Sequence, residues 1–250
     1  MPLSSSSKKA LESWQYRAAE IILRTKLNIP RSALLLELGW EPITVFIDRS
    51  KVSYFKRLSE LPDSRLCKQV YNKMIILNDT FWNYVNEIQS ICMGSDPTNQ
   101  NFSRKYGSIT RNRLLLDVTN KSSLYLYQYF YIKEGKQVYL DNQNDFKASR
   151  LKLLARTKTI PLQKYLCRMN LSGEMTCPLC KTDTDEDLEH FLLYCPTFSS
   201  IRNEFFKVFD SFVENQKYDL KFMELSSSAK LLFLIGDISY AFTNEFGIFL

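Results

Sequence analysis

The sequence is short of histidine and glycine, with one histidine and seven glycines in 250 residues. A Ser-His-Asp or Cys-His catalytic site needs a histidine, and the only one, His190, lies among cysteines that suit a metal. There is also no Gly-x-x-x-x-Gly-Lys-Ser/Thr loop, no Gly-x-Gly-x-x-Gly fingerprint and no adjacent pair of aspartates. We therefore predict a protein that is not an enzyme. A magnesium-dependent nuclease site at Asp117, Asp141 and Asp145 is the remaining catalytic alternative, although scattered acids are usually surface residues or helix caps.

Long apolar runs are absent as well, so we expect no membrane span. The first residues include four serines and two lysines with no apolar run behind them, which does not fit a signal peptide. Three of the six cysteines, Cys67, Cys92 and Cys167, lie in apolar periodic stretches, as buried free thiols do. This usage is typical of a reducing compartment, so we expect an intracellular protein of the nucleus or cytoplasm.

The other three cysteines and the histidine form the only cluster of metal-binding residue types. The spacing is Cys177-Pro-Leu-Cys180, nine residues, His190, four residues, and Cys195. Thiolate and imidazole are the ligands that Zn²⁺ prefers, and three Cys with one His make a closed structural site without a position for water. We therefore predict that Cys177, Cys180, His190 and Cys195 bind a structural zinc ion. A redox pair at Cys-x-x-Cys is one alternative, but no thioredoxin-like context precedes it, and chance spacing of buried thiols is another.

The residues around these ligands predict a turn that faces a helix. In a Cys-x-x-Cys turn, the backbone N–H groups after the first Cys usually point at its sulfur, and Pro178 needs no donor there. Asp183 or Thr184 can cap a helix from Asp185 to about Tyr194, which would carry the histidine. Pro196 then ends or redirects the chain.

Helical periodicity dominates the rest of the chain, and the fold class we predict is mainly α: an irregular multi-helix assembly with one small zinc-stapled turn-helix unit. A polar loop over 94–103 divides a linker-like helical region, 1–103, from a second helical region, 104–250, that contains the metal motif. One expected apolar stripe comprises Leu11, Trp14, Ala18, Ile21 and Ile22. The expected helices span 8–27, 31–38, 41–61, 63–93, two within 108–132, 146–158, 162–166, 197–213 and 226–249.

Positive charge is concentrated just before the metal motif, in a chain of net charge +6. Between residues 147 and 168 there is no acid, and such a segment attracts polyanions, although a solvated face is the usual alternative. Tyrosines and a phenylalanine over 125–131 could stack on bases, but in a helical protein they more often form core. The candidate nucleic-acid contacts are Lys147, Arg150, Lys152, Arg156, Lys158, Lys164 and Arg168.

Two stretches together resemble a known family. The basic segment 149–166 runs into Cys177-Pro-Leu-Cys180 and then into 187–196, which reads Asp-Leu-Glu-His-Phe-Leu-Leu-Tyr-Cys-Pro. This resembles the region downstream of the reverse transcriptase in polyproteins of non-LTR (LINE-type) retrotransposons, where a basic helical segment precedes a Cys-Cys-His-Cys zinc motif. The match covers about 145–205, and 36–71 is similar to the helical linker of these polyproteins.

The resemblance implies zinc at Cys177, Cys180, His190 and Cys195 and engagement of RNA or DNA, without the catalysis of the polymerase and endonuclease, whose motifs are absent. We therefore predict a nucleic-acid-binding module that acts mainly through phosphate contacts. The alternative is a protein-interaction or scaffolding module, with a partner docked on the apolar C-terminal helix over 226–249. An inactive retroelement remnant with a purely structural zinc is a further alternative.

Overall fold

The structure is a computed structural model that describes residues 4–25, 29–77, 79–92, 102–130, 134–141, 146–215 and 222–235. It divides into two compact units, one comprising Met1–Thr25 and Arg31–Asp117, the other Lys26–Pro30 and Val118–Leu250. Helices dominate both, and the described residues contain no strand beyond one isolated antiparallel bridge. The prediction of a mainly α fold is therefore confirmed. Among the described helices, none combines the length and apolar character needed to cross a membrane.

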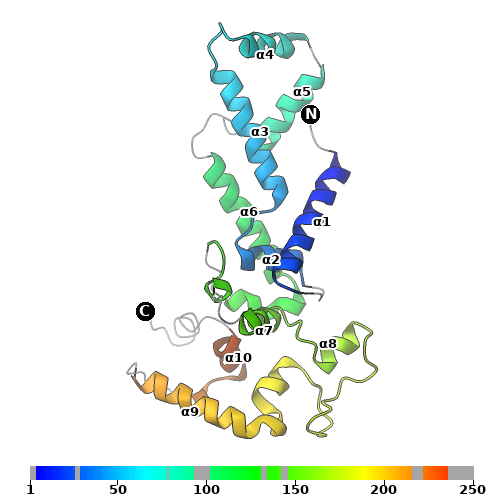
Figure 1. The fold of residues 1–250 in the computed structure, drawn as a ribbon, viewed down its shortest axis with the longest axis vertical. Helices are drawn as coiled ribbons and strands as arrows, with labels where there is room; N and C mark the ends of the chain where they lie inside the picture. The colour runs from blue at the N-terminus through cyan, green and yellow to red at the C-terminus, as the bar shows by residue number, and fades with distance from the viewer. Residues whose placement is uncertain are drawn as a thin grey trace. The chain divides into compact units, whose positions relative to one another are not determined.

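The first unit is built from helices α1 to α6 (Figure 1). Its core lies between α3 and α5, where Val52, Ile88 and Cys92 are buried and aromatic side chains pack around them. Helix α4 contacts both α3 and α5. The bounds are α1 Ser5–Ile22, α2 Arg31–Leu38, α3 Ile43–Glu60, α4 Leu66–Leu77, α5 Asp79–Ile91 and α6 Phe102–Thr119.

The single helix predicted over 63–93 is wrong, because α4 ends at Leu77 and α5 begins at Asp79. The sequence is consistent with a break there, because Asn, Asp and Thr, which follow one another at 78–80, have low helix propensity. The predicted loop over 94–103 lies almost wholly outside the described residues. The main boundary between the two compact units follows Asp117, near the end of α6.

The apolar stripe predicted for α1 is not a core face. Trp14, Ile21 and Ile22 are 69%, 75% and 51% exposed. Instead α1 is fixed by polar bonds: Gln15 Nε2 donates to the Glu41 carbonyl at 2.7 Å, and Gln15 Oε1 accepts the Ile43 N–H at 2.8 Å. The prediction failed because helical spacing identifies an apolar face but not what covers it.

The second unit carries the candidate site. Leu153 and Leu154 of α7 and Leu231 of α10 are buried in its core. Only the first part of the predicted C-terminal helix falls within the described residues, and there α10 is a core element rather than an exposed docking face. The bounds are η1 Ser122–Tyr129, η2 Val138–Asp141, α7 Phe146–Arg156, α8 Gln163–Arg168, η3 His190–Tyr194, η4 Pro196–Phe198, α9 Ser199–Asn215, η5 Phe222–Glu224 and α10 Ser227–Ile235.

Several local predictions are refined. The second helix expected within 108–132 is the 3-10 helix η1, and Tyr127 and Phe130 near its end are buried, as the core alternative predicts. The side chains of Tyr125 and Tyr129, and residue Tyr131, lie outside the described set. Cys67 is exposed, contrary to prediction, and Cys167 is partly exposed, while Cys92 is buried.

Helix α7 ends in an unusual way. Lys158, which follows it, has a φ of 53°, and the Thr159 N–H donates to the Leu154 carbonyl at 2.9 Å, as in a Schellman motif. Glycine usually occupies this left-handed position, as Gly39 does after α2, and another residue costs about 1 kcal/mol. The non-glycine residues that take this conformation after helices are Arg24, Lys158 and Asn170.

Candidate metal centre

Four metal-ligating side chains that are separated along the sequence converge in the second unit: Cys177, Cys180, His190 and Cys195. One ligand atom from each lies within 4.8 Å of all the others. The Cys177 and Cys195 sulfurs are 4.0 Å apart, and Cys180 Sγ is 3.4 Å from His190 Nε2. A tetrahedral zinc with bonds of about 2.3 Å to sulfur and about 2.0 Å to nitrogen separates its ligand atoms by about 3.5–3.8 Å. One such ion can therefore bridge the four side chains.

The first two ligands lie in a short hairpin. Thr176 and Asp185 form an antiparallel bridge, and the Cys177 N–H donates to the Thr184 carbonyl at 2.9 Å. The chain reverses through residues 181 and 183, which have positive φ angles of 55° and 50°. A helix starting at Asp185 was therefore the wrong prediction, because this residue pairs in the bridge.

The Cys177 sulfur receives the backbone hydrogen bonds that the Cys-x-x-Cys turn predicts. Burial is the largest influence on this thiol and raises its pKa. The N–H groups of residues 179 and 180 point at the sulfur and lower the pKa in part, because they favour the thiolate. The same N–H groups would stabilise the charged form that a metal binds.

The other two ligands lie at the start and just beyond the end of a π-helical turn, η3. Asp187 Oδ1 accepts the His190 N–H at 2.9 Å and thereby caps this turn. The Cys195 N–H donates to the His190 carbonyl at 2.7 Å, an i→i+5 bond. In a regular α-helix, residues five apart point about 140° apart, whereas the wider turn brings Cys195 back over His190. The π-helical turn thus places both ligands on one side.

Hydroxyl groups connect the two halves of the cluster. Thr182 Oγ1 is 2.9 Å from Cys180 Sγ and 2.8 Å from Thr184 Oγ1, which is 3.4 Å from His190 Nδ1. With Nε2 facing the sulfurs, Nδ1–H donates to Thr184, Thr184 to Thr182, and Thr182 to the Cys180 sulfur. The Thr182 hydroxyl is the main reason why the pKa of Cys180 is lowered to about 6. This series of hydrogen bonds favours both the thiolate of Cys180 and the imidazole tautomer of His190 that a metal needs.

Helix α8 is attached to the hairpin by carboxylates. Glu186 is buried, and its Oε2 accepts the Gln163 N–H at 2.9 Å, at the start of α8. Lys164 Nζ lies 3.1 Å from both Asp185 Oδ2 and Asp187 Oδ2. Lys164, predicted to contact nucleic acid, therefore already has two carboxylate partners, and its pKa is raised chiefly by its hydrogen bond to Asp185.

Arg202 of α9 holds the end of the π-helical turn. Its Nε donates to the Leu192 carbonyl at 2.9 Å, and its Nη2 donates to the Cys195 carbonyl at 2.8 Å. Both carbonyls lie at the end of the π-helical turn, and the Cys195 carbonyl also accepts the Phe198 N–H at 3.2 Å, so the guanidinium helps to fix the backbone of the fourth ligand. The sequence alone did not identify Arg202, Glu186, Thr182 or Thr184, although the repeated threonines beside Cys180 are a usable signal for hydroxyl support.

Two side chains of the basic segment, Arg156 and Lys152, pack against aromatic rings. Arg156 is only 2% exposed, and its guanidinium lies 4.1 Å from the Phe130 ring centroid, with Tyr127 and Tyr139 also within 6 Å. Lys152 Nζ lies over the Tyr139 ring at 5.2 Å. The structure therefore places Arg156 where a phosphate cannot reach it and engages Lys152 with an aromatic face.

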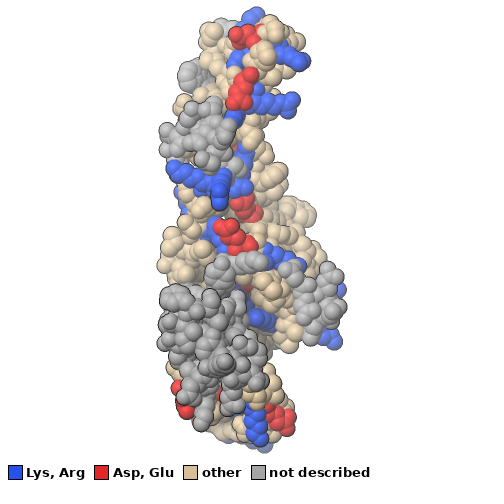
Figure 2. All heavy atoms as spheres, turned by 90° about the vertical axis from the view of Figure 1, so that its left-hand side faces the viewer, with Lys and Arg blue, Asp and Glu red and all other residues tan. Residues whose placement is uncertain are grey.

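The remaining basic residues fall into two groups. Lys147 and Arg150 are exposed on α7. Lys158, Lys164 and Arg168 instead surround a pocket whose opposite wall carries acidic residues of 186–189. A segment that is free of acid in sequence is therefore close to acids in space. On the face drawn in Figure 2, Lys and Arg likewise form separate groups interspersed with Asp and Glu.

The described residues do not show a magnesium-dependent nuclease site at Asp117, Asp141 and Asp145. Asp117 accepts a hydrogen bond from Ser32 Oγ at 2.5 Å, while the side chain of Asp141 and residue Asp145 are not described. The four-residue Cys/His group is the one metal-ligating cluster found in the part of the chain that the structure describes.

Comparison with known proteins gave no match: no protein-family model, no curated protein and no solved structure is significantly similar to this chain. Inferences about function therefore rest on the residues and their geometry.

Proposed function

We propose that Cys177, Cys180, His190 and Cys195 bind one Zn²⁺ ion with a structural role. The donor set and the ligand distances described above carry this proposal, because three thiolates and one imidazole suit zinc better than hard cations. Four protein ligands leave no position for a reacting water, so the ion would stabilise the fold rather than act on a substrate.

The second unit would bind RNA or DNA through phosphate contacts, and the exposed cations of α7 are the observation that carries this function. Lys147 and Arg150 lie one turn apart, α7 contains no acid, and neither side chain forms an ion pair with a described residue. Phosphate contacts of this kind give affinity without base specificity.

Charge reversal on α7 tests this function. We expect Arg150→Glu to weaken binding to a fluorescein-labelled stem-loop about tenfold and to reduce the slope of log affinity against log salt by about one. Lys207→Glu, on the exposed surface of α9, makes the same change in net charge and is the matched control. Fluorescence anisotropy between about 50 and 200 mM salt measures both quantities. Equal effects of the two variants would rule out α7 as the contact surface.

A second candidate function is protein association through α9. Ile201, Phe205 and Val208 are 67%, 52% and 69% exposed, and their spacing of four and three residues is that of a coiled-coil seam. Under this alternative the protein sediments as a dimer, and Phe205→Asp converts it to a monomer, while Lys207→Glu does not. A wild-type monomer in sedimentation velocity, at concentrations up to about 100 μM, would exclude it.

A further inference from the structure

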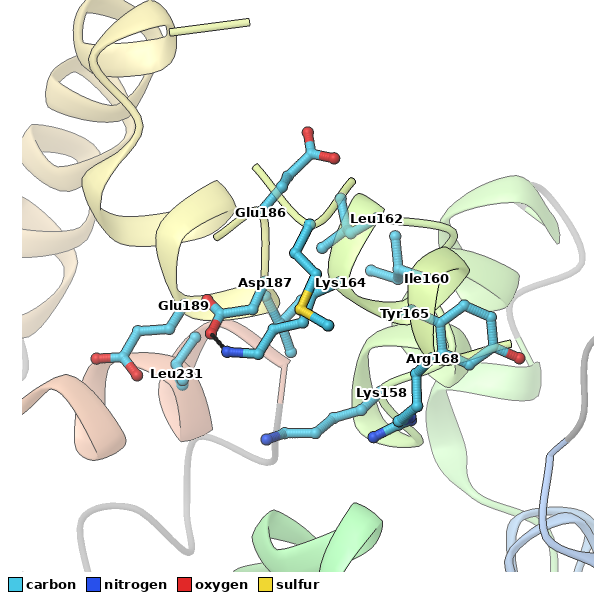
Figure 3. Close-up of a pocket in the computed structure, with 12 residues that line it drawn as sticks. Lys158, Ile160, Leu162, Lys164, Tyr165, Arg168, Glu186, Asp187, Glu189 and Leu231 are labelled. Carbon is cyan, nitrogen blue, oxygen red and sulfur yellow. Dashed lines mark hydrogen bonds and ion pairs between the residues drawn. The ribbon is translucent and has the colours of Figure 1, made fainter. Parts of the chain in front are cut away.

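A pocket of about 320 Å³ lies beside the metal hairpin, within the second unit (Figure 3). Its volume is in the range of about 300–1,000 Å³ that small-ligand sites occupy. The apolar side chains come from four parts of the chain: the segment before α8, α8 itself, the hairpin with its following turn, and α10. They are Ile160, Leu162, Tyr165, Met175, Leu188 and Leu231.

The side chains of Lys158 and Arg168 extend into this pocket on the same side (Figure 3). Lys164 is held by Asp185 and Asp187, but no described carboxylate lies within ion-pair distance of Arg168. Lys158 is partly buried, and burial is the main reason why its pKa is lowered to about 8; the nearby carboxylates of Asp187 and Glu189 oppose this shift, and Arg168 adds to it. Lys158 and Arg168 are therefore close together in a partly desolvated site, and an anion that entered it would form a charge-assisted contact with the Arg168 guanidinium.

The backbone of Lys158 provides an independent observation. This residue occupies the left-handed position after α7 that glycine fills best, with a φ of 53°. Asn170 occupies the same position after α8, with a φ of 57°, but is not among the residues that line the pocket. A residue kept at a strained position often serves a binding or catalytic site.

We propose that this pocket binds one unpaired nucleotide of a single-stranded nucleic acid, which makes the nucleic-acid binding proposed above more specific and rests on it. Lys158 and Arg168 would hold the phosphate, and the apolar walls would receive the base. Glu189 on the opposite wall can accept a hydrogen bond from an exocyclic amino group. A base stacked in a duplex cannot enter, so the pocket favours single strands.

Two pocket variants and one matched control test this inference. Lys158→Gly removes the ammonium and relieves the backbone, so we expect an unchanged or higher melting temperature, by about 2–4 °C. It should weaken binding of a fluorescein-labelled 12-nucleotide single strand about tenfold and that of a 12-base-pair duplex by less than twofold. Arg168→Gln should act in the same direction on the single strand. Asn170→Gly relieves the same backbone strain and should change neither affinity.

The outcomes separate this inference from the function on which it rests. If Arg150→Glu weakens binding but Lys158→Gly and Arg168→Gln do not, the pocket is not a nucleotide site and the surface function stands. If Lys158→Gly weakens single strand and duplex equally, Lys158 is an ordinary phosphate contact and the pocket inference is wrong. If wild-type protein binds neither nucleic acid, both proposals are overturned.

Discussion

Replacing Cys180 with serine is expected to unfold residues 174–200 while the helices of the first unit remain folded. Structural zinc contributes about 10–16 kcal/mol in small zinc-finger peptides, which is as large as the whole stability of a typical domain. The hairpin itself has one isolated bridge, and the hydrogen bonds and exposed ion pairs that attach it to α8 contribute much less than a bound structural ion. Amide hydrogen exchange, followed by mass spectrometry, should show fast exchange throughout 174–200 and unchanged protection in α3 and α5.

Cys167→Ser is the matched control for this experiment. Cys167 lies in α8, close in sequence to the hairpin, but is not one of the four ligands. The same Cys-to-Ser change there should leave exchange over 174–200 and the response to chelator unaltered. A protein whose melting temperature and exchange pattern are the same with and without a strong chelator would not depend on a structural metal.

Arg156→Ala is expected to destabilise the second unit by about 3 kcal/mol without directly weakening nucleic-acid contacts. A desolvated cation–π interaction contributes about 2 kcal/mol, and removal of the buried side chain leaves a cavity beside Phe130 and Tyr127. Arg156→Met keeps most of the apolar volume and should recover part of the loss. Urea unfolding of the three proteins, followed by far-ultraviolet circular dichroism, measures these differences.

Arg150 provides the contrast on the same helix. Because its side chain is exposed, Arg150→Ala should change stability by less than about 0.5 kcal/mol while weakening nucleic-acid binding. The two arginines then have opposite roles, one in the core and one at the surface. A stable Arg156→Ala protein with binding weakened as much as in Arg150→Ala would disprove this division.

The ligands of the candidate metal centre could be predicted because their chemistry is local. Three cysteines and the single histidine stand within 19 residues, from Cys177 to Cys195, and no other residues compete as soft ligands there. The geometry that brings them together could not be predicted in the same way. The π-helical turn depends on an Asp187 cap and on Arg202, which comes from a different helix and has no recognisable spacing to the motif.

For the basic segment 147–168, the sequence could not predict which of the cations are exposed. Along the sequence, residues 147–168 contain no acid, and all seven cations are equivalent by that measure. Folding places Arg156 among aromatic rings and Lys164 beside Asp185 and Asp187. Those partners come from 17 or more residues away in the chain, so only the fold decides which cations remain at the surface.

Zinc K-edge X-ray absorption, combined with the metal content of the purified protein, tests the central claim most directly. The account predicts one zinc ion per chain with three sulfur ligands at about 2.3 Å and one nitrogen ligand at about 2.0 Å, and a Cys180→Ser protein that loses this signal. Purified protein that folds with no bound metal, or zinc held mainly by oxygen ligands, would contradict it.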